Sequence, residues 1–378
     1  MPAVINPYLP STFMRKLFQK LFTKPVIWAA NKFSSKPDKE RIFKALTELH
    51  ATIENAPAGK KGLVINITQQ NQRYVILSDQ HKGARNDADD FAGAEKNYLA
   101  ALDYYFDNGF YYINLGDSEE LWENNIFAVK KHNKATFEKE TLFLQNQRFY
   151  KIFGNHDLYW DNDPLASIQL KEIYGEKVCI YEGVILKAGS NDNNLSIFCT
   201  HGHQGDLQSD GNWFSKFFVA NVWEPIQAYL KINPNTPAYN EQLKTVHNTL
   251  MYEWSSDKKN TILITGHTHQ PVFESLTLLE RLYQQLEIAQ QKNDAEAVKK
   301  IQSHITVQLS KGDIMADYTK YKPGYFNSGC CCFSDGDITG IEIADGSIRL
   351  VKWEYDSDVP TRKILEESAL KDVAARLG

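Results

Sequence analysis

Five apolar runs in this chain each end in a cluster of side chains that could bind metal ions. The clusters read SDQH (78–81), GDSEE (116–120), GNHD (154–157), THGH (200–203) and TGHTH (265–269). Their carboxylate, amide and imidazole groups suit borderline-to-hard ions such as Mn, Fe or Zn. Two such ions about 3.5–4 Å apart can clamp a phosphoryl group and lower the pKa of a shared water. The residue types therefore indicate metal-assisted cleavage of a P–O bond.

The clusters must come together for this chemistry to work. A single Gly-Asp is usually a turn, and a single Gly-His-x-His is usually part of a polar surface. Here each cluster follows a run predicted as a buried strand, and ligands in α/β sheets gather at the carboxyl ends of strands. Glycines before Asp117, Asn155 and His267 let the backbone turn tightly and approach the ions. Together the five clusters predict one shared crevice.

In this order the clusters resemble the motifs of the calcineurin-like metallophosphoesterase family. The resemblance covers about residues 73–270 plus the terminal strands. It implies an α/β fold, a four-layer α/β/β/α sandwich, and two divalent ions, with Mn the first choice in an assay. It also implies a division of ligands: Asp79, His81 and His269 for one ion, Asn155, His201 and His267 for the other, and Asp117 bridging both.

The resemblance also suggests which residues act on the substrate. His156 would stabilise charge on the phosphoryl oxygens or protonate the leaving oxygen. Glu120 matches the acidic residue that orients this histidine, although it could instead be an exposed carboxylate at a helix start. His203 could contact substrate or simply line the crevice. Arg85 and Asn86 could contact phosphate or belong to a solvated loop.

The substrate remains open between monoesters, diesters and nucleotide or lipid pyrophosphates. The GDSEE motif and the aromatic segment from Trp213 to Leu230 are similar to the UDP-2,3-diacylglucosamine pyrophosphohydrolase branch. That branch uses an apolar helical cap for acyl chains. It typically has Arg where this chain has His156, and its members are shorter. The aromatic segment could instead be a core or dimer helix.

Two other classes of function compete with hydrolysis. A non-catalytic protein-binding module of the same fold would usually lack metal ligands or the substrate histidine, whereas this chain retains all of them. A nuclease is disfavoured, and no nucleic acid polymer is expected as a partner, because the net charge is −5 with a sequence pI near 6.1.

Composition indicates a globular protein in a reducing compartment. Of the 378 residues, 42% are hydrophobic and 24% charged. Cys330, Cys331 and Cys332 are expected to pack as small apolar residues in a strand. With no secretory signal and no run of about 18 apolar residues, we expect a cytoplasmic location. The basic N-terminal helix around Arg15 and Lys16 could touch an anionic membrane or pack on its own domain. The oligomeric state stays open.

Periodicity then divides the chain into expected units. A helical extension covers 1–60, with Ile42, Leu46, Leu49 and Ile53 at helical spacing. The catalytic domain covers 61–358, with a helical cap inserted at about 207–250 and a helical hairpin at about 275–305. A helical tail is expected over 359–378.

Overall fold

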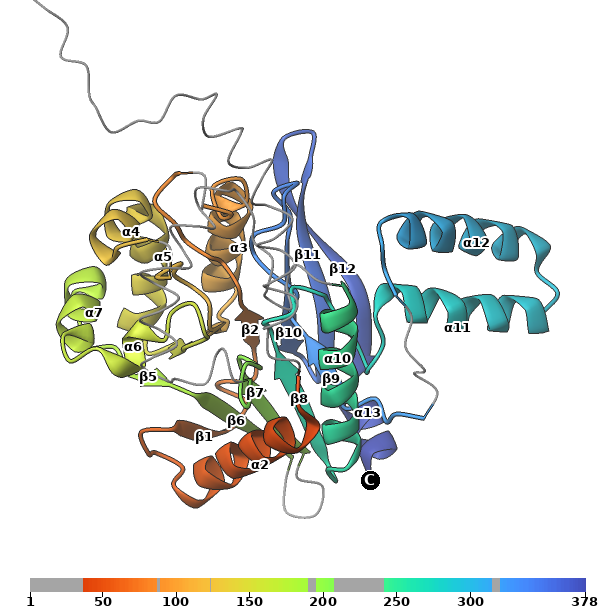
Figure 1. Cartoon of the computed structure of the whole chain (residues 1–378), viewed down its shortest axis with the longest axis horizontal. Coiled ribbons are helices and arrows are strands. Elements are labelled where there is room, and N and C mark those ends of the chain that lie inside the picture. The colour runs from red at the N-terminus through yellow and green to blue at the C-terminus, as the bar shows by residue number, and fades with distance from the viewer. Residues whose placement is uncertain (1–36, 87–88, 123, 190–194, 207–240, 315–319) are drawn as a thin grey trace, which may run out of the picture.

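The computed structural model describes residues 37–86, 89–122, 124–189, 195–206, 241–314 and 320–378. Within these ranges, two β-sheets pack face to face and helices cover the outer face of each sheet (Figure 1). This arrangement confirms the predicted α/β class with layers in the order α/β/β/α. The segment 1–36 and most of the predicted cap, 207–240, lie outside the described residues.

The larger sheet has seven described strands, in the order β12-β11-β10-β2-β3-β4-β5. Its parallel half consists of β2 (Tyr74–Leu77), β3 (Tyr111–Leu115), β4 (Phe149–Ile152) and β5 (Ile180–Tyr181). Three antiparallel strands continue the sheet beyond β2: β10 (Ile338–Ala344), β11 (Ser347–Asp356) and β12 (Val359–Ala369). Because β2, β3 and β4 are parallel, the first three motifs begin at one edge of this sheet.

The smaller sheet has five described strands, in the order β1-β6-β7-β8-β9. These are β1 (Gly62–Asn66), β6 (Gly183–Ala188), β7 (Leu195–Thr200), β8 (Thr261–Thr265) and β9 (Tyr325–Asn327). Strands β6 and β7 are antiparallel, whereas β7, β8 and β9 run parallel. The fourth and fifth motifs follow β7 and β8, so they too start at a common edge.

The inner faces of the two sheets share one apolar core. Ile76, Ile113 and Ile152 from the larger sheet pack in the same cluster as Ile197 and Ile264 from the smaller sheet, and all five are fully buried. Burial of such side chains contributes on the order of 1.5–3 kcal/mol each. This core fixes the two sheets relative to each other, and with them the strand ends that carry the motifs.

Helices cover both outer faces. The larger sheet is covered by α3 (Glu95–Asp107), α4 (Ile126–His132), α5 (Lys134–Gln145), α6 (Tyr159–Asn162) and α7 (Ala166–Tyr174) (Figure 1). The smaller sheet is covered by α2 (Lys39–Asn55) and α10 (Glu241–Ser256). Helix α2 starts after Asp38, whose side chain accepts a hydrogen bond from the Arg41 amide at 2.9 Å. Its predicted apolar stripe is buried, as expected.

Helices α11 (Leu278–Gln291) and α12 (Ala295–Ser310) pack against each other and project away from the sandwich (Figure 1). Leu279, Leu282 and Ile305 form the small core between them. The pair coincides with the helical hairpin predicted near 275–305. Among the described residues, no helix is both long and apolar enough to cross a bilayer.

Two expectations are corrected at the C-terminal side. The first half of the predicted helical tail is strand β12, and only α13 (Leu370–Leu377) is helical. Strand β12 pairs with β11 along its whole length, and this pairing outweighs the good helix formers in its sequence. Cys330, Cys331 and Cys332 lie in a loop after β9 rather than in a strand, and all five cysteines are free thiols.

Candidate metal centre

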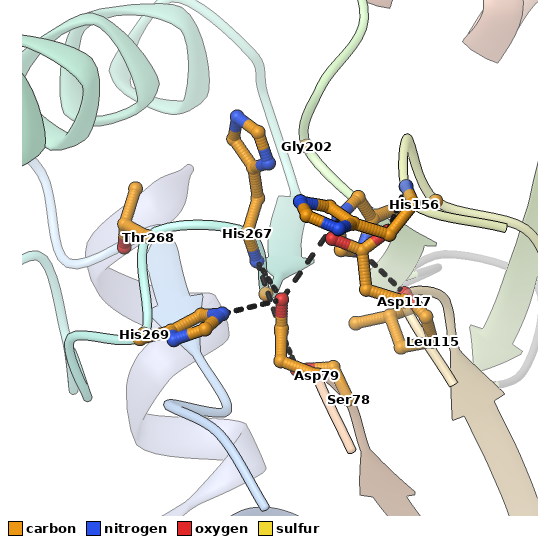
Figure 2. Close-up of polar contacts among 12 residues, drawn as sticks. Ser78, Asp79, Leu115, Asp117, His156, Gly202, His267, Thr268 and His269 are labelled. Atoms are coloured by element: carbon orange, nitrogen blue, oxygen red, sulfur yellow. Dashed lines mark hydrogen bonds and ion pairs between the residues drawn. The ribbon is translucent and has the colours of Figure 1, made fainter. Parts of the chain in front are cut away.

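The motif loops of the two sheets meet over the ends of the parallel strands (Figure 2). Backbone hydrogen bonds join neighbouring loops: the His81 amide donates to the Asp117 carbonyl at 2.9 Å, and the Gly266 amide donates to the His201 carbonyl at 3.0 Å. Contact between the sheets is direct, because the His267 amide donates to the Asp79 carboxylate at 3.0 Å. The predicted convergence of the motif loops is therefore present.

The first group of expected ligands lies close together. His269 Nε2 is 3.2 Å from Asp79 Oδ1 and 3.1 Å from His81 Nε2. His81 Nε2 is also 3.9 Å from both Asp79 Oδ1 and Asp117 Oδ2. Asp79, His81 and Asp117 can thus offer three ligand atoms within 4.8 Å of one another.

The second group shares Asp117 with the first. Asp117, His201 and His267 likewise offer ligand atoms within 4.8 Å of one another. His201 Nε2 is 3.1 Å from Asp117 Oδ2, the same oxygen that lies near His81. Asn155, next along the loop after β4, is buried. Asp117 therefore stands between two sets of donors, where a bridging ligand is needed.

Buried polar atoms without hydrogen-bond partners indicate whether metal ions fit this centre. Asn155 Oδ1 and His267 Nε2 are buried and have no hydrogen-bond partner in the described structure. Buried polar atoms are rarely left without a partner. These oxygen and nitrogen atoms are also the donor types that Mn, Fe and Zn accept. The residues fit a pair of divalent cations.

The charge balance of the centre points the same way. Burial lowers the pKa of His201, but Asp117 and Asp79 outweigh this effect and raise it to about 9. Burial raises the pKa of Asp117, yet His201 and His156 hold it well below its usual range. Asp117 is thus held ionised, and divalent cations would offset the charge of this buried carboxylate.

The backbone carries these ligands in an unusual conformation. Five of the expected ligands have positive φ angles between 49° and 68°: Asp79, His81, Asp117, His267 and His269. Residues other than glycine rarely adopt this left-handed region. The preceding glycines serve close approach, because a Cβ on Gly154 would collide with the Asp117 carboxylate and a Cβ on Gly266 would collide with Asp79.

His156 and Glu120 stand beside the ligands. One oxygen of Glu120 contacts two rings, at 2.7 Å from His156 Nδ1 and 2.8 Å from His81 Nδ1. Burial would raise the pKa of Glu120, but His156 and His81 lower it to about 2. The Trp122 indole stacks on the His156 ring with centroids 4.1 Å apart. Glu120 is thus buried rather than an exposed helix-start carboxylate, and it contacts both His81, an expected ligand, and His156, the expected substrate histidine.

The other expected substrate residues lie in different settings. His203 is buried, with its ring centroid 5.4 Å from that of His201. Arg85 pairs with Glu95 at 2.6 Å, and the Asn86 amide donates to Asn124 at 3.1 Å. These protein contacts engage the groups that were expected to bind phosphate. For Arg85 and Asn86 a substrate role remains a prediction.

Sequence reasoning missed two residues beside the ligands. His247 on α10 is buried, its ring centroid is 5.2 Å from that of His267, and its Nδ1 has no partner among the described residues. Cys332 Sγ is 3.8 Å from His269 Nδ1. Neither residue follows a predicted strand, so the strand-end pattern could not find them. The adjacent cysteines were visible in the sequence, but the expected strand placed them in the core.

Comparison with known proteins gives one family match and two solved structures of low similarity. The family model described as "Calcineurin-like phosphoesterase" matches residues 72–271. A solved structure of Vacuolar Protein Sorting 29 from Cryptosporidium parvum is 12% identical, with 79% of this chain and 98% of that chain covered and a TM-score of 0.31. A dimetal phosphatase from Danio rerio is 8% identical, with the same two coverages and a TM-score of 0.32. No curated protein sequence matches.

Proposed function

Because the chain belongs to the calcineurin-like phosphoesterase family, we propose that it hydrolyses phosphoesters with two divalent cations. One observation carries the proposal: two sets of ligand atoms share Asp117, and His156 lies beside them on Glu120. The seven proposed ligands are Asp79, His81, Asp117, Asn155, His201, His267 and His269. The two cations would supply Lewis acidity to the phosphoryl oxygens and lower the pKa of a water.

The protein's own contribution begins with the position of Asp117. Its Oδ1 accepts a hydrogen bond from the His156 amide at 2.7 Å, which leaves Oδ2 directed at the two sets of donors. The carboxylate is therefore fixed before any ion or substrate arrives. This fixed position matters because catalysis by preorganised groups avoids reorganisation during the reaction.

Glu120 determines where the two neighbouring histidines carry their protons. Its ionised carboxylate only accepts hydrogen bonds, so His81 and His156 must both donate from Nδ1. The lone pair on His81 Nε2 is then available for a cation. On His156, a second proton would reside on Nε2 and could pass to the leaving oxygen. Trp122 keeps the His156 ring in one plane by stacking on it.

The choice of substrate stays at the level of the family, whose substrates are phosphoesters. Monoesters, diesters and nucleotide or lipid pyrophosphates all contain the bond that this centre would cut. The aromatic segment that would receive acyl chains in a diacylglucosamine-type enzyme lies outside the described residues. The identity of the cations is likewise to be measured, with Mn, Fe and Zn as the tested ions.

The experiment separates metal binding from turnover. We would measure the metal content of the purified protein and screen aryl phosphomonoesters, aryl phosphodiesters and nucleotide pyrophosphates with added Mn²⁺. Asp117→Asn should lose both bound metal and activity. His156→Ala should keep its metal but lose activity about 10²–10⁴-fold, as expected for a lost proton donor. His304→Ala, which removes an exposed histidine from α12, is the matched control.

Two results would contradict the proposal. Protein without stoichiometric metal after Mn²⁺ loading would remove its basis. Full turnover by His156→Ala would show that this histidine does not act on the substrate.

A further inference from the structure

Two of the four proposed ligand histidines, His81 and His201, are held from behind by oxygen atoms. The second ring nitrogen of His81 faces Glu120 at 2.8 Å, and that of His201 faces the carbonyl of Leu115 at 2.9 Å. Such partners fix the orientation and basicity of a metal-binding imidazole. At His269 thiols take this place: Cys332 Sγ lies 3.8 Å from Nδ1, and the Cys330 side chain also hydrogen-bonds this histidine, while Nε2 faces Asp79.

A second thiol lies beside Cys332. The side chains of Cys330 and Cys332 hydrogen-bond each other. The Cys331 thiol contacts the carbonyl of Thr339 instead, at 3.9 Å. Cys330 is buried and Cys332 is half-buried, so Cys332 is the one open to a small reagent. The loop therefore presents a pair of thiols, two residues apart, directly behind a proposed metal ligand.

We propose that Cys330 and Cys332 are a modification site, where a hydroperoxide forms a reversible disulfide that weakens metal binding by His269. The inference rests on the metal pair of the proposed function. In the first step one thiol of the pair attacks the O–O bond of ROOH, giving a sulfenic acid (–SOH) and ROH. In the second step the other thiol displaces water from that sulfenic acid and forms the S–S bond. The two thiols lose two electrons in total, and the peroxide takes them up.

The disulfide would act on His269 by moving the sulfur atoms behind it. A cation on Nε2 leaves the proton of His269 on Nδ1, where it is donated to sulfur, and the disulfide draws the Cys330 and Cys332 sulfurs to a fixed S–S separation of about 2.05 Å. With both sulfurs shifted, the hydrogen bond from Nδ1–H is weakened and the His269 ring is less firmly oriented toward the cation. Loss of such an outer partner typically weakens metal binding about 10–100-fold. We expect an effect of that size at the ion held by Asp79, His81 and His269.

The test uses full-length protein loaded with zinc, because Zn²⁺ is not itself oxidised by peroxide. After treatment with H₂O₂ and removal of the peroxide, free thiols are blocked and the peptide carrying residues 330–332 is weighed by mass spectrometry. Zinc content and zinc affinity are measured on the same sample, before oxidation, after oxidation and after dithiothreitol. The variants are Cys330→Ser and Cys332→Ser. Cys179→Ser, which removes the exposed cysteine near β5, is the matched control.

Wild-type protein and Cys179→Ser should form the 330–332 disulfide and bind one of the two zinc ions about 10–100-fold more weakly. Dithiothreitol should restore the affinity. Neither Cys330→Ser nor Cys332→Ser should form this disulfide or show a reversible loss. The inference is overturned if wild type forms no such bond, or forms it and keeps its zinc affinity. Protein that binds no zinc before oxidation would instead contradict the proposed function.

Discussion

Buried ion pairs support the ligand loops of the seven-stranded sheet, whereas neutral hydrogen bonds support those of the five-stranded sheet. Beneath the first set, Glu119 lies 3.1 Å from Lys82 and 2.9 Å from Lys151, and Lys82 also lies 2.7 Å from Glu140. All four side chains are fully buried. Burial raises the pKa of Glu119, but Lys151 and Lys82 outweigh it and hold the pKa at about 2, so the carboxylate stays charged.

The loops on the five-stranded sheet have amide and hydroxyl partners instead. Asn327 donates to the Gly266 carbonyl at 2.7 Å, and Asn248 on α10 donates to Gln270 at 2.7 Å. Helix α10 also places His247 beside these loops. Burial lowers the pKa of His247 to about 4, so its imidazole is neutral near pH 7. Because a charge left without its partner costs far more than a neutral group, we expect the two halves to respond differently to mutation.

The largest loss of stability should come from Glu119→Ala, which removes a carboxylate from the buried ion pairs beneath the seven-stranded sheet's loops. This change leaves Lys151 and one side of Lys82 without their carboxylate in a fully buried site. Breaking a buried ion pair by removing one partner typically costs about 3–5 kcal/mol of unfolding free energy. Urea denaturation of the metal-free protein would measure it, with Glu119→Gln as the variant that keeps hydrogen-bond capacity. A loss below about 1 kcal/mol would show that the pairs do not support the fold.

An intermediate effect is expected from His247→Ala in the neutral half, on metal affinity rather than stability. His267 Nε2 and His247 Nδ1 are both buried without partners, and their rings are adjacent. The two rings pack edge to face with centroids 5.2 Å apart, so removal of His247 should leave His267 less firmly oriented and weaken the binding of one metal ion about tenfold or more. Titration with Mn²⁺ would measure this, and His247→Asn should recover part of the affinity. Unchanged affinity in both variants would contradict such a role.

A smaller loss of stability should come from Asn248→Ala. Its amide donates to Gln270, and its oxygen accepts hydrogen bonds from Thr268 and Tyr325 at 3.3 Å each. Losing neutral hydrogen bonds in a buried site should cost about 1–3 kcal/mol. Thermal unfolding of Asn248→Ala and of Glu119→Ala would show which variant loses more stability. If Asn248→Ala destabilised the protein more, the distinction between charged and neutral support would fail.

Much of the fold was predictable because local patterns and tertiary structure agree. The alternating and continuous apolar runs became the parallel strands, and Asp345-Gly346 forms the predicted tight turn between β10 and β11, with positive φ at both residues. The expected metal ligands were predictable for a related reason. They follow these strands directly, so their convergence is a consequence of parallel strand order.

The features that were not predicted depend on contacts distant in sequence. Strand β12 contains Leu, Glu, Lys and Ala, which favour helix, and only its pairing with β11 makes it a strand. His247 reaches the centre from the middle of a helix. Glu119 stands next to Glu120 in the sequence, yet its burial beside Lys82 and Lys151 separates its role from that of Glu120. Neither the spacing of residues nor the composition of the sequence predicts contacts of this kind.

The left-handed backbone at five of the expected ligand residues fixes the loop conformation before any ion binds. Each such residue raises the energy of the folded chain by about 1–3 kcal/mol, and the surrounding sandwich must compensate for it during folding. Little chain entropy is then left to be lost when cations bind. Removal and rebinding of the ions should therefore leave the conformation of these loops unchanged.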